Sequence, residues 1–113
     1  MESRIQVSKL IGSASALTVE QGNILYNEII RLLKKNEKVN IDFSGIESII
    51  TPFLNASIGK LYESYTSENI KNCLRITNQH EGTNRKFNMV IRNAKQFYSN
   101  KDAYVDIVEN VLS

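Results

Sequence analysis

The sequence has very little of what builds a catalytic or metal centre. It contains one histidine, His80, and one cysteine, Cys73. Structural zinc usually takes four protein ligands and catalytic zinc three, so this supply falls short of any zinc set. A Ser-His-Asp or Cys-His device would have to be assembled around His80, in a polar loop and without a nucleophile-elbow sequence. We therefore expect no metal, no cofactor and no enzymatic activity.

Other scarcities exclude further classes of protein. Five scattered glycines form neither GxGxxG nor GxxxxGK[ST], so nucleotide binding is unsupported. A lone cysteine cannot form an internal disulfide, and Cys73 fits the role of a small buried hydrophobe. No apolar run approaches the roughly 18 residues of a membrane span, and the opening MESRIQVSKLIG lacks a signal-peptide pattern. We expect a cytoplasmic protein that does not enter the membrane.

The overall composition is that of an ordinary folded domain. The 113 residues are 42% hydrophobic and 23% charged, which predicts one ordered domain over residues 1–113. A net charge of +2 is too small to indicate polyanion binding by itself. The segment from Lys71 to Lys101, however, contains seven basic residues and only one acidic residue, Glu81. Nucleic-acid binding through Arg85, Lys86, Arg92 and Lys95 is therefore the alternative function. The simpler explanation of these basic residues is a solvent-exposed helix face.

Hydrophobic periodicity predicts an α/β fold of order β-α-β-α-β-α-α, with a mixed β-sheet packed by helices. Strands are expected over residues 5–11, 38–43 and 70–77, because apolar residues there alternate with polar ones or form short runs bounded by loops. Helices are expected from 18 to about 36, from 51 to about 65, over 87–98 and over 102–112. The terminal helix suits either packing on its own domain or forming a dimer.

Two helix starts are marked by capping residues. Thr18 and Gln21 have the spacing of a capping box. In this motif the side chain of each residue accepts a hydrogen bond from the backbone amide of the other. Thr51 followed by Pro52 predicts a threonine N-cap with proline at the first helical position.

The most informative stretch runs from Val39 to Tyr62 and reads VNIDFSGIESIITPFLNASIGKLY. A strand ending in Asp-Phe-Ser-Gly is followed by a hydrophobic link and then by a hydroxyl residue at a helix start. This pattern resembles the core signature of STAS domains, the family that includes anti-sigma-factor antagonists. It is more closely similar to the bacterial STAS-like family of unknown function, which Leu10-Ile11-Gly12 and Leu17 to Gly22 also resemble.

The resemblance implies a regulatory module that binds a protein partner, such as a kinase of the histidine-kinase-like ATPase superfamily. In antagonists that kinase phosphorylates a serine or threonine at the start of the second helix, and Thr51 occupies that position here. Two neighbours differ, since Ile50 replaces the usual aspartate and Pro52 a small residue.

The partner surface is expected where the second strand runs into the second helix. The candidate residues there are Ser44, Gly45, Glu47, Ser48, Thr51, Pro52 and Asn55. Simpler roles remain open, because Thr51 could only cap its helix, Ser44 and Gly45 could only form a turn, and Asp42 could accept turn amides.

Overall fold

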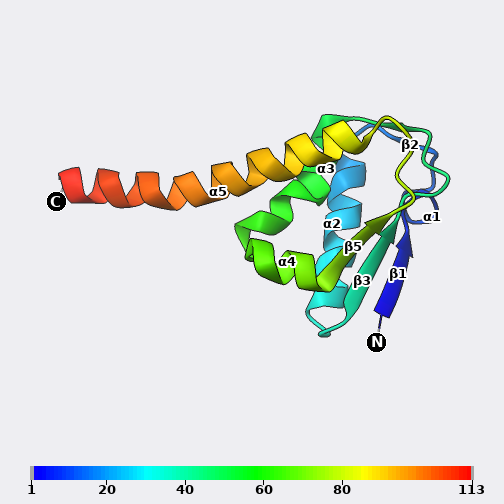
Figure 1. Ribbon diagram of the computed structural model, residues 1–113, viewed down its shortest axis with the longest axis horizontal. Coiled ribbons are helices and arrows are strands. Elements are labelled where there is room, and N and C mark those ends of the chain that lie inside the picture. Colours follow the sequence, from blue (N-terminus) through cyan, green and yellow to red (C-terminus); the bar gives the residue numbers. More distant parts are fainter. Residues whose placement is uncertain (1, 113) are drawn as a thin grey trace.

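The computed structural model describes the backbone of residues 2–112 and the side chains of residues 2–99 (Figure 1). Its main sheet has the order β1-β3-β5, formed by Glu2–Gln6, Lys38–Asp42 and Leu74–Thr77. A smaller sheet pairs β2 (Ser15–Ala16) with β4 (Ser48–Ile49). The α/β fold class is confirmed. The structure adds that every strand pair within residues 2–112 is parallel rather than of mixed direction.

The helices differ greatly in length. They are α1 (Val7–Ile11), α2 (Val19–Leu33), α3 (Thr51–Ser57), the 3₁₀ helix η1 (Gly59–Glu63), α4 (Ser67–Cys73) and α5 (Asn84–Leu112). In Figure 1, α5 begins near the end to which the arrows of β3 and β5 point, crosses beside α3 and then extends past the body of the domain. None of the helices within residues 2–112 is long and apolar enough to cross a membrane.

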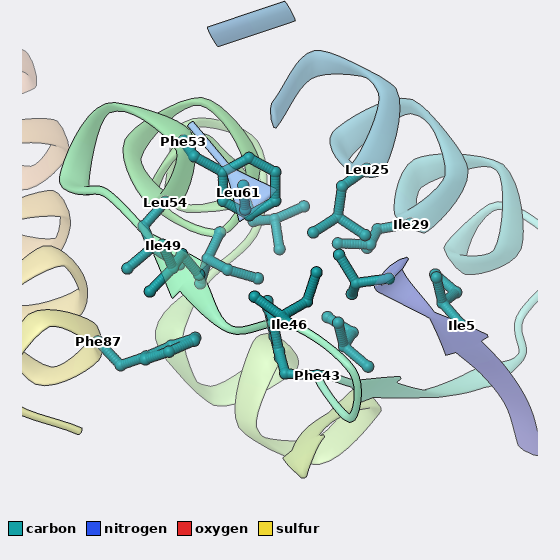
Figure 2. Packing of buried hydrophobic residues seen from close by; sticks show 14 of the residues in the cluster. Ile5, Leu25, Ile29, Phe43, Ile46, Ile49, Phe53, Leu54, Leu61 and Phe87 are labelled. Atoms are coloured by element: carbon teal, nitrogen blue, oxygen red, sulfur yellow. The ribbon is translucent and has the colours of Figure 1, made fainter. Parts of the chain in front are cut away.

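The core lies between the main sheet and the helices that cover it (Figure 2). Phe43, which follows β3, meets Phe87 of α5 edge to face with ring centroids 5.0 Å apart. The contact between α2 and α3 is close because Gly22 has no side chain. A Cβ at Gly22 would lie 2.7 Å from the Phe53 carbonyl oxygen and 2.8 Å from the Ala56 Cβ. Glycine at this position therefore sets how near the two helices approach.

Two expected strands contain helices instead. The expected strand over 5–11 is wrong beyond Gln6, because Val7–Ile11 forms α1 and Gly12 ends it in the left-handed conformation with φ 68°. The expected strand over 70–77 is wrong before Leu74. Thr66 accepts a hydrogen bond from the Asn69 amide and starts α4, which extends through Cys73. Both segments are helical although their short apolar runs also fit a strand. Gly12 ends α1, and the Thr66 cap starts α4.

The expected break between two C-terminal helices is also wrong. Residues 84–112 form one continuous helix, since Ser99-Asn100-Lys101 contains neither proline nor glycine to interrupt it. Conversely, the second expected helix is divided into α3 and the 3₁₀ helix η1. Whether the terminal segment 102–112 packs on its own domain or forms a dimer concerns side chains that lie outside the described residues.

Candidate functional site

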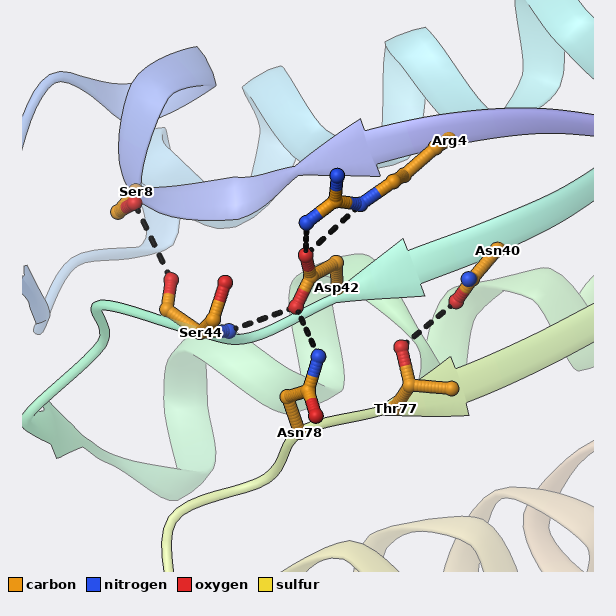
Figure 3. A network of polar contacts seen from close by, with 7 residues as sticks. All are labelled: Arg4, Ser8, Asn40, Asp42, Ser44, Thr77 and Asn78. Carbon is orange, nitrogen blue, oxygen red and sulfur yellow. Dashed lines mark hydrogen bonds and ion pairs between the residues drawn. The ribbon is translucent and has the colours of Figure 1, made fainter.

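A buried carboxylate organises the end of the main sheet (Figure 3). Asp42, the last residue of β3, is fully buried. Its Oδ1 accepts hydrogen bonds from the Ser44 amide at 2.9 Å and from the Asn78 side chain at 2.8 Å. Its Oδ2 pairs with the Arg4 guanidinium, whose Nε lies 2.8 Å away. We call these four residues the Asp42 junction; it links β1, β3 and the residue that follows β5 to the loop after β3.

The protonation of Asp42 follows from these partners. Burial alone would raise the pKa of the carboxyl group, because a charge is poorly solvated in the interior. Hydrogen bonds from Asn78, the Ser44 amide and Arg4 outweigh burial and hold the pKa of Asp42 well below its usual range. The group is therefore a charged structural anchor at neutral pH. The interpretation that Asp42 accepts a turn amide is confirmed by the bond from Ser44.

The turn after Asp42 depends on a glycine for two reasons. Gly45 has φ 84°, a conformation that residues with a side chain rarely adopt. A Cβ there would also lie 2.9 Å from the Ser8 Oγ. The same Ser8 hydroxyl donates to the Ser44 carbonyl oxygen at 3.3 Å. Ser44 and Gly45 thus form the expected turn, held on one side by α1.

Beyond this turn the chain is fixed by pairing with β2. The amide of Glu47 donates to the Ala14 carbonyl at 2.7 Å, and the amide of Ile50 donates to the Ala16 carbonyl at 3.1 Å. The parallel register places Ala16 opposite Ile49. The start of α3 is consequently beside the link between β2 and α2.

The predicted cap of α3 is wrong by one residue. Ile50 is the N-cap, with φ −120° and ψ 158° and no side-chain cap hydrogen bond. Its carbonyl accepts from the Leu54 amide at 3.3 Å, which is the first bond of the helix. Thr51 is therefore the first helical residue and Pro52 the second. The hydrogen bond to Ala16 keeps Ile50 extended, so the N-cap is Ile50 and not Thr51. The Thr51 hydroxyl therefore has no role as a helix cap.

The predicted partner residues form one ribbon of chain along this edge. Gly45, Glu47, Ser48, Pro52 and Asn55 are exposed, while Ser44 and Thr51 are half-buried. Lys86 of α5 donates from Nζ to the Ile49 carbonyl oxygen at 3.0 Å, two residues before Thr51. The structure therefore keeps a cationic group next to the α3 start.

Sequence reasoning missed two apolar residues beside this ribbon. Leu17 is 45% exposed and Val19 is 47% exposed. Leu17 directly follows β2, which pairs with β4, and Val19 opens α2, which packs on α3 through Gly22. Both residues are of the core-forming type, and only the three-dimensional arrangement shows that they remain outside the core. We define the β4–α3 surface as these two residues together with the seven predicted ones.

The residues considered for catalysis and for nucleic-acid binding are not among the residues of the β4–α3 surface. His80 is exposed, and its Nδ1 is 2.8 Å from the Glu81 carbonyl oxygen. Within the described residues, no group of three or more His, Cys, Asp or Glu side chains could hold a metal ion. The alternative nucleic-acid residues Arg85, Lys86, Arg92 and Lys95 are exposed along the first half of α5, but Lys86 is engaged with Ile49.

Comparisons with known proteins identify the family but no individual relative. No curated protein matches the chain, and no solved structure matches it. One family model, the STAS-like domain of unknown function (DUF4325), matches residues 21–83. The match covers the Asp42 junction except Arg4, together with the turn at Gly45 and all of α3. It spans more than half of the 113 residues, and this chain belongs to that STAS-like family.

Proposed function

We propose that this chain is a cytoplasmic regulatory module that binds a protein partner through the β4–α3 surface, without catalysing a reaction itself. The proposed partner is a kinase of the histidine-kinase-like ATPase superfamily or a regulator associated with one. Resemblance to anti-sigma-factor antagonists supports this class of partner. The geometry contributes an exposed edge, held by backbone hydrogen bonds to residues 14–16, that contains both polar and apolar groups.

The observation that carries the proposal is the exposure of Leu17 and Val19 next to the α3 start. Scattered apolar residues are ordinary on protein surfaces, but aliphatic side chains grouped beside exposed polar residues are typical of contact sites. Leu17, Val19 and the exposed ring of Pro52 come from segments that the β2–β4 pair and the α2–α3 contact hold together. A partner would bury them without a rearrangement of the backbone.

Phosphorylation of Thr51 is the proposed control of this contact. The hydroxyl is not required as a helix cap, because Ile50 holds that position. A phosphate on Thr51 would add about two negative charges at neutral pH and a large polar group beside Leu17 and Val19. Desolvation of that group would oppose burial against a partner. Lys86 donates to the carbonyl oxygen of Ile49, two residues before Thr51, and so supplies a cation that can pair with the phosphate in the free protein.

The experiment is a comparison of matched variants as bait in a lysate of the native cell. Wild type, Val19→Glu, Thr51→Glu and Ile24→Glu are each immobilised, and retained proteins are quantified by mass spectrometry. Ile24 is the control because it is 46% exposed on the same helix as Val19 but lies outside the β4–α3 surface. We expect a kinase-like ATPase on wild type and Ile24→Glu, reduced at least about tenfold on Val19→Glu and Thr51→Glu.

Two results would contradict the proposal. Equal losses for Val19→Glu and Ile24→Glu would mean that the surface has no special part in binding. The absence of any kinase-like ATPase, together with an unmodified Thr51 in chain recovered from cells, would remove the partner class and the switch. Circular dichroism of each variant verifies that lost binding does not reflect unfolding.

A further inference from the structure

Two adjoining cavities lie along one side of α5, and neither includes a residue of the β4–α3 surface. The smaller has a volume of about 270 Å³ and is lined by α4, β5 and α5, in the region between the labels α4 and α5 of Figure 1. The larger, of about 700 Å³, is lined by residues 62–67 and by residues of α5 from Lys95 to Ser99. Together they are on the scale of small-ligand sites, which measure roughly 300–1,000 Å³.

The smaller cavity is aliphatic and carries positive charge. Its apolar lining consists of Ile58, Ile70, Leu74, Ile76 and Ile91. The two charged residues that line it are Lys71 and Lys95, and both are exposed. Among the side chains that the structure describes, neither lysine has an acidic partner. This combination suits a ligand with a hydrocarbon part and a negative charge.

The place of the negative group follows from the residues shared by the two cavities, which are Tyr62, Ser67 and Lys95. Lys95 offers an ammonium group, and the other two offer hydroxyl groups, a set that binds a carboxylate through charge-assisted hydrogen bonds. Burial raises the pKa of Tyr62, so its hydroxyl remains a neutral donor. Among the described residues that line either cavity the one acid is Glu63, and it lines the larger cavity alone. An anion is therefore favoured where the cavities meet and opposed farther into the larger one.

We propose that this groove binds a free medium-chain fatty acid as its carboxylate. The hydrocarbon chain lies in the aliphatic cavity between α4 and α5, and the carboxylate lies at Lys95, Tyr62 and Ser67. The larger cavity, which is rich in hydroxyl groups, leaves the carboxylate open to water. The site shares no residue with the β4–α3 surface, so the proposal stands independently of the proposed function.

A series of ligands tests the groove in the wild-type protein. Hexanoate, octanoate and decanoate are titrated by isothermal titration calorimetry below the concentrations at which they form micelles. Affinity should rise about fourfold for each added CH₂ group, because each one moves from water into aliphatic surroundings. Octanol, which has no negative charge, should bind at least about fivefold more weakly than octanoate, and the cation octylamine more weakly still.

Matched variants locate the site. Lys95→Met should weaken octanoate binding about tenfold, because it removes the cation and keeps a long side chain. Arg92→Met is the control, since Arg92 is an exposed cation of α5 that lines neither cavity, and the affinity should change less than about twofold. Ile91→Asp puts a negative charge beside the hydrocarbon chain and should abolish detectable binding. Circular dichroism verifies that each variant remains folded.

Several results would overturn the proposal. The first is the lack of saturable octanoate binding to wild type, and the second is an affinity that does not depend on chain length. Equal losses for Lys95→Met and Arg92→Met would show attraction to the net charge of the protein and no defined site. Tighter binding of octylamine than of octanoate would show that the groove selects cations.

Discussion

The Asp42 junction and the β4–α3 surface share Ser44, but the central side chains of the two regions differ sharply in burial. Asp42 is fully buried and receives hydrogen bonds from three partners. Across the turn, Leu17 and Val19 are nearly half exposed although they are aliphatic. Buried polar groups whose hydrogen bonds are satisfied stabilise the local backbone, while solvent-exposed apolar side chains are available to contact a partner. The first region is therefore scaffold, and the second is the one to test for binding.

Removal of the Asp42 carboxylate should give the largest loss of stability. We expect Asp42→Ala to lower the free energy of unfolding by about 3 kcal/mol, because the Ser44 amide and Asn78 lose a charged acceptor inside the protein. Arg4→Ala is the control, with a loss below about 1 kcal/mol, since the Arg4 side chain is largely exposed. Urea unfolding measures both. Similar losses for the two variants would show that the ion pair, rather than the buried hydrogen bonds, holds the junction.

The α2–α3 contact should be the next most sensitive. Gly22→Ala should cost about 2 kcal/mol, because its Cβ would collide with the Phe53 carbonyl and displace a helix. Gly59→Ala is the matched control and should change stability by less than about 1 kcal/mol, since its Cβ would meet the Val90 Cγ1 at 3.4 Å. Thermal unfolding of the pair separates a backbone collision from the general effect of adding a methyl group.

The Asp42 junction should also make stability depend on pH, by less than the full effect of Asp42→Ala. The pKa of Asp42 is lowered in the folded protein, while an unfolded aspartate titrates near about 3.9. The folded state gains stability above that unfolded pKa, and this gain is lost as the pH falls below about 4. The urea midpoint of wild type should therefore fall more steeply between pH 5 and about 3 than that of Asp42→Asn. Parallel curves would mean that other carboxyl groups dominate acid unfolding.

The two threonines at helix starts should differ, with the smallest effects of this series. Thr18→Ala should cost about 1 kcal/mol, because Thr18 forms a capping box with Gln21. Thr51→Ala should cost less than about 0.5 kcal/mol, because Ile50 is the cap of α3. If Thr51→Ala matches Thr18→Ala in chemical unfolding, Thr51 belongs to the scaffold, and its proposed role in regulation loses its main structural support.

The parts of the fold that could be predicted are those set by neighbouring residues. The capping box at Thr18 and the alternation over Lys38–Asp42 depend on sequence positions a few residues apart, and both appear as expected. The short helices α1 and α4 were missed because their apolar residues also fit a strand, although Gly12 and Thr66 carried a usable signal. The site was only partly predictable for the same reason. The exposure of Leu17 and the cap at Ile50 arise from the pairing of β2 with β4, which are 33 residues apart.

Every strand pair within residues 2–112 is parallel, and this affects the order in which the parts of the chain can fold. Ile5 pairs with Ile41, and Ile41 pairs with Ile76, so each contact of the main sheet closes a loop of about 35 residues. None of the described strands of the main sheet pairs with a strand that follows it through a short turn. The entropy of loop closure must therefore be overcome before this sheet forms. During synthesis β1 leaves the ribosome before β3 and has no pairing partner in the main sheet until β3 follows. Helix α2 has its own cap and depends on no distant strand. It is therefore the element that can form earliest and bring β1 and β3 together.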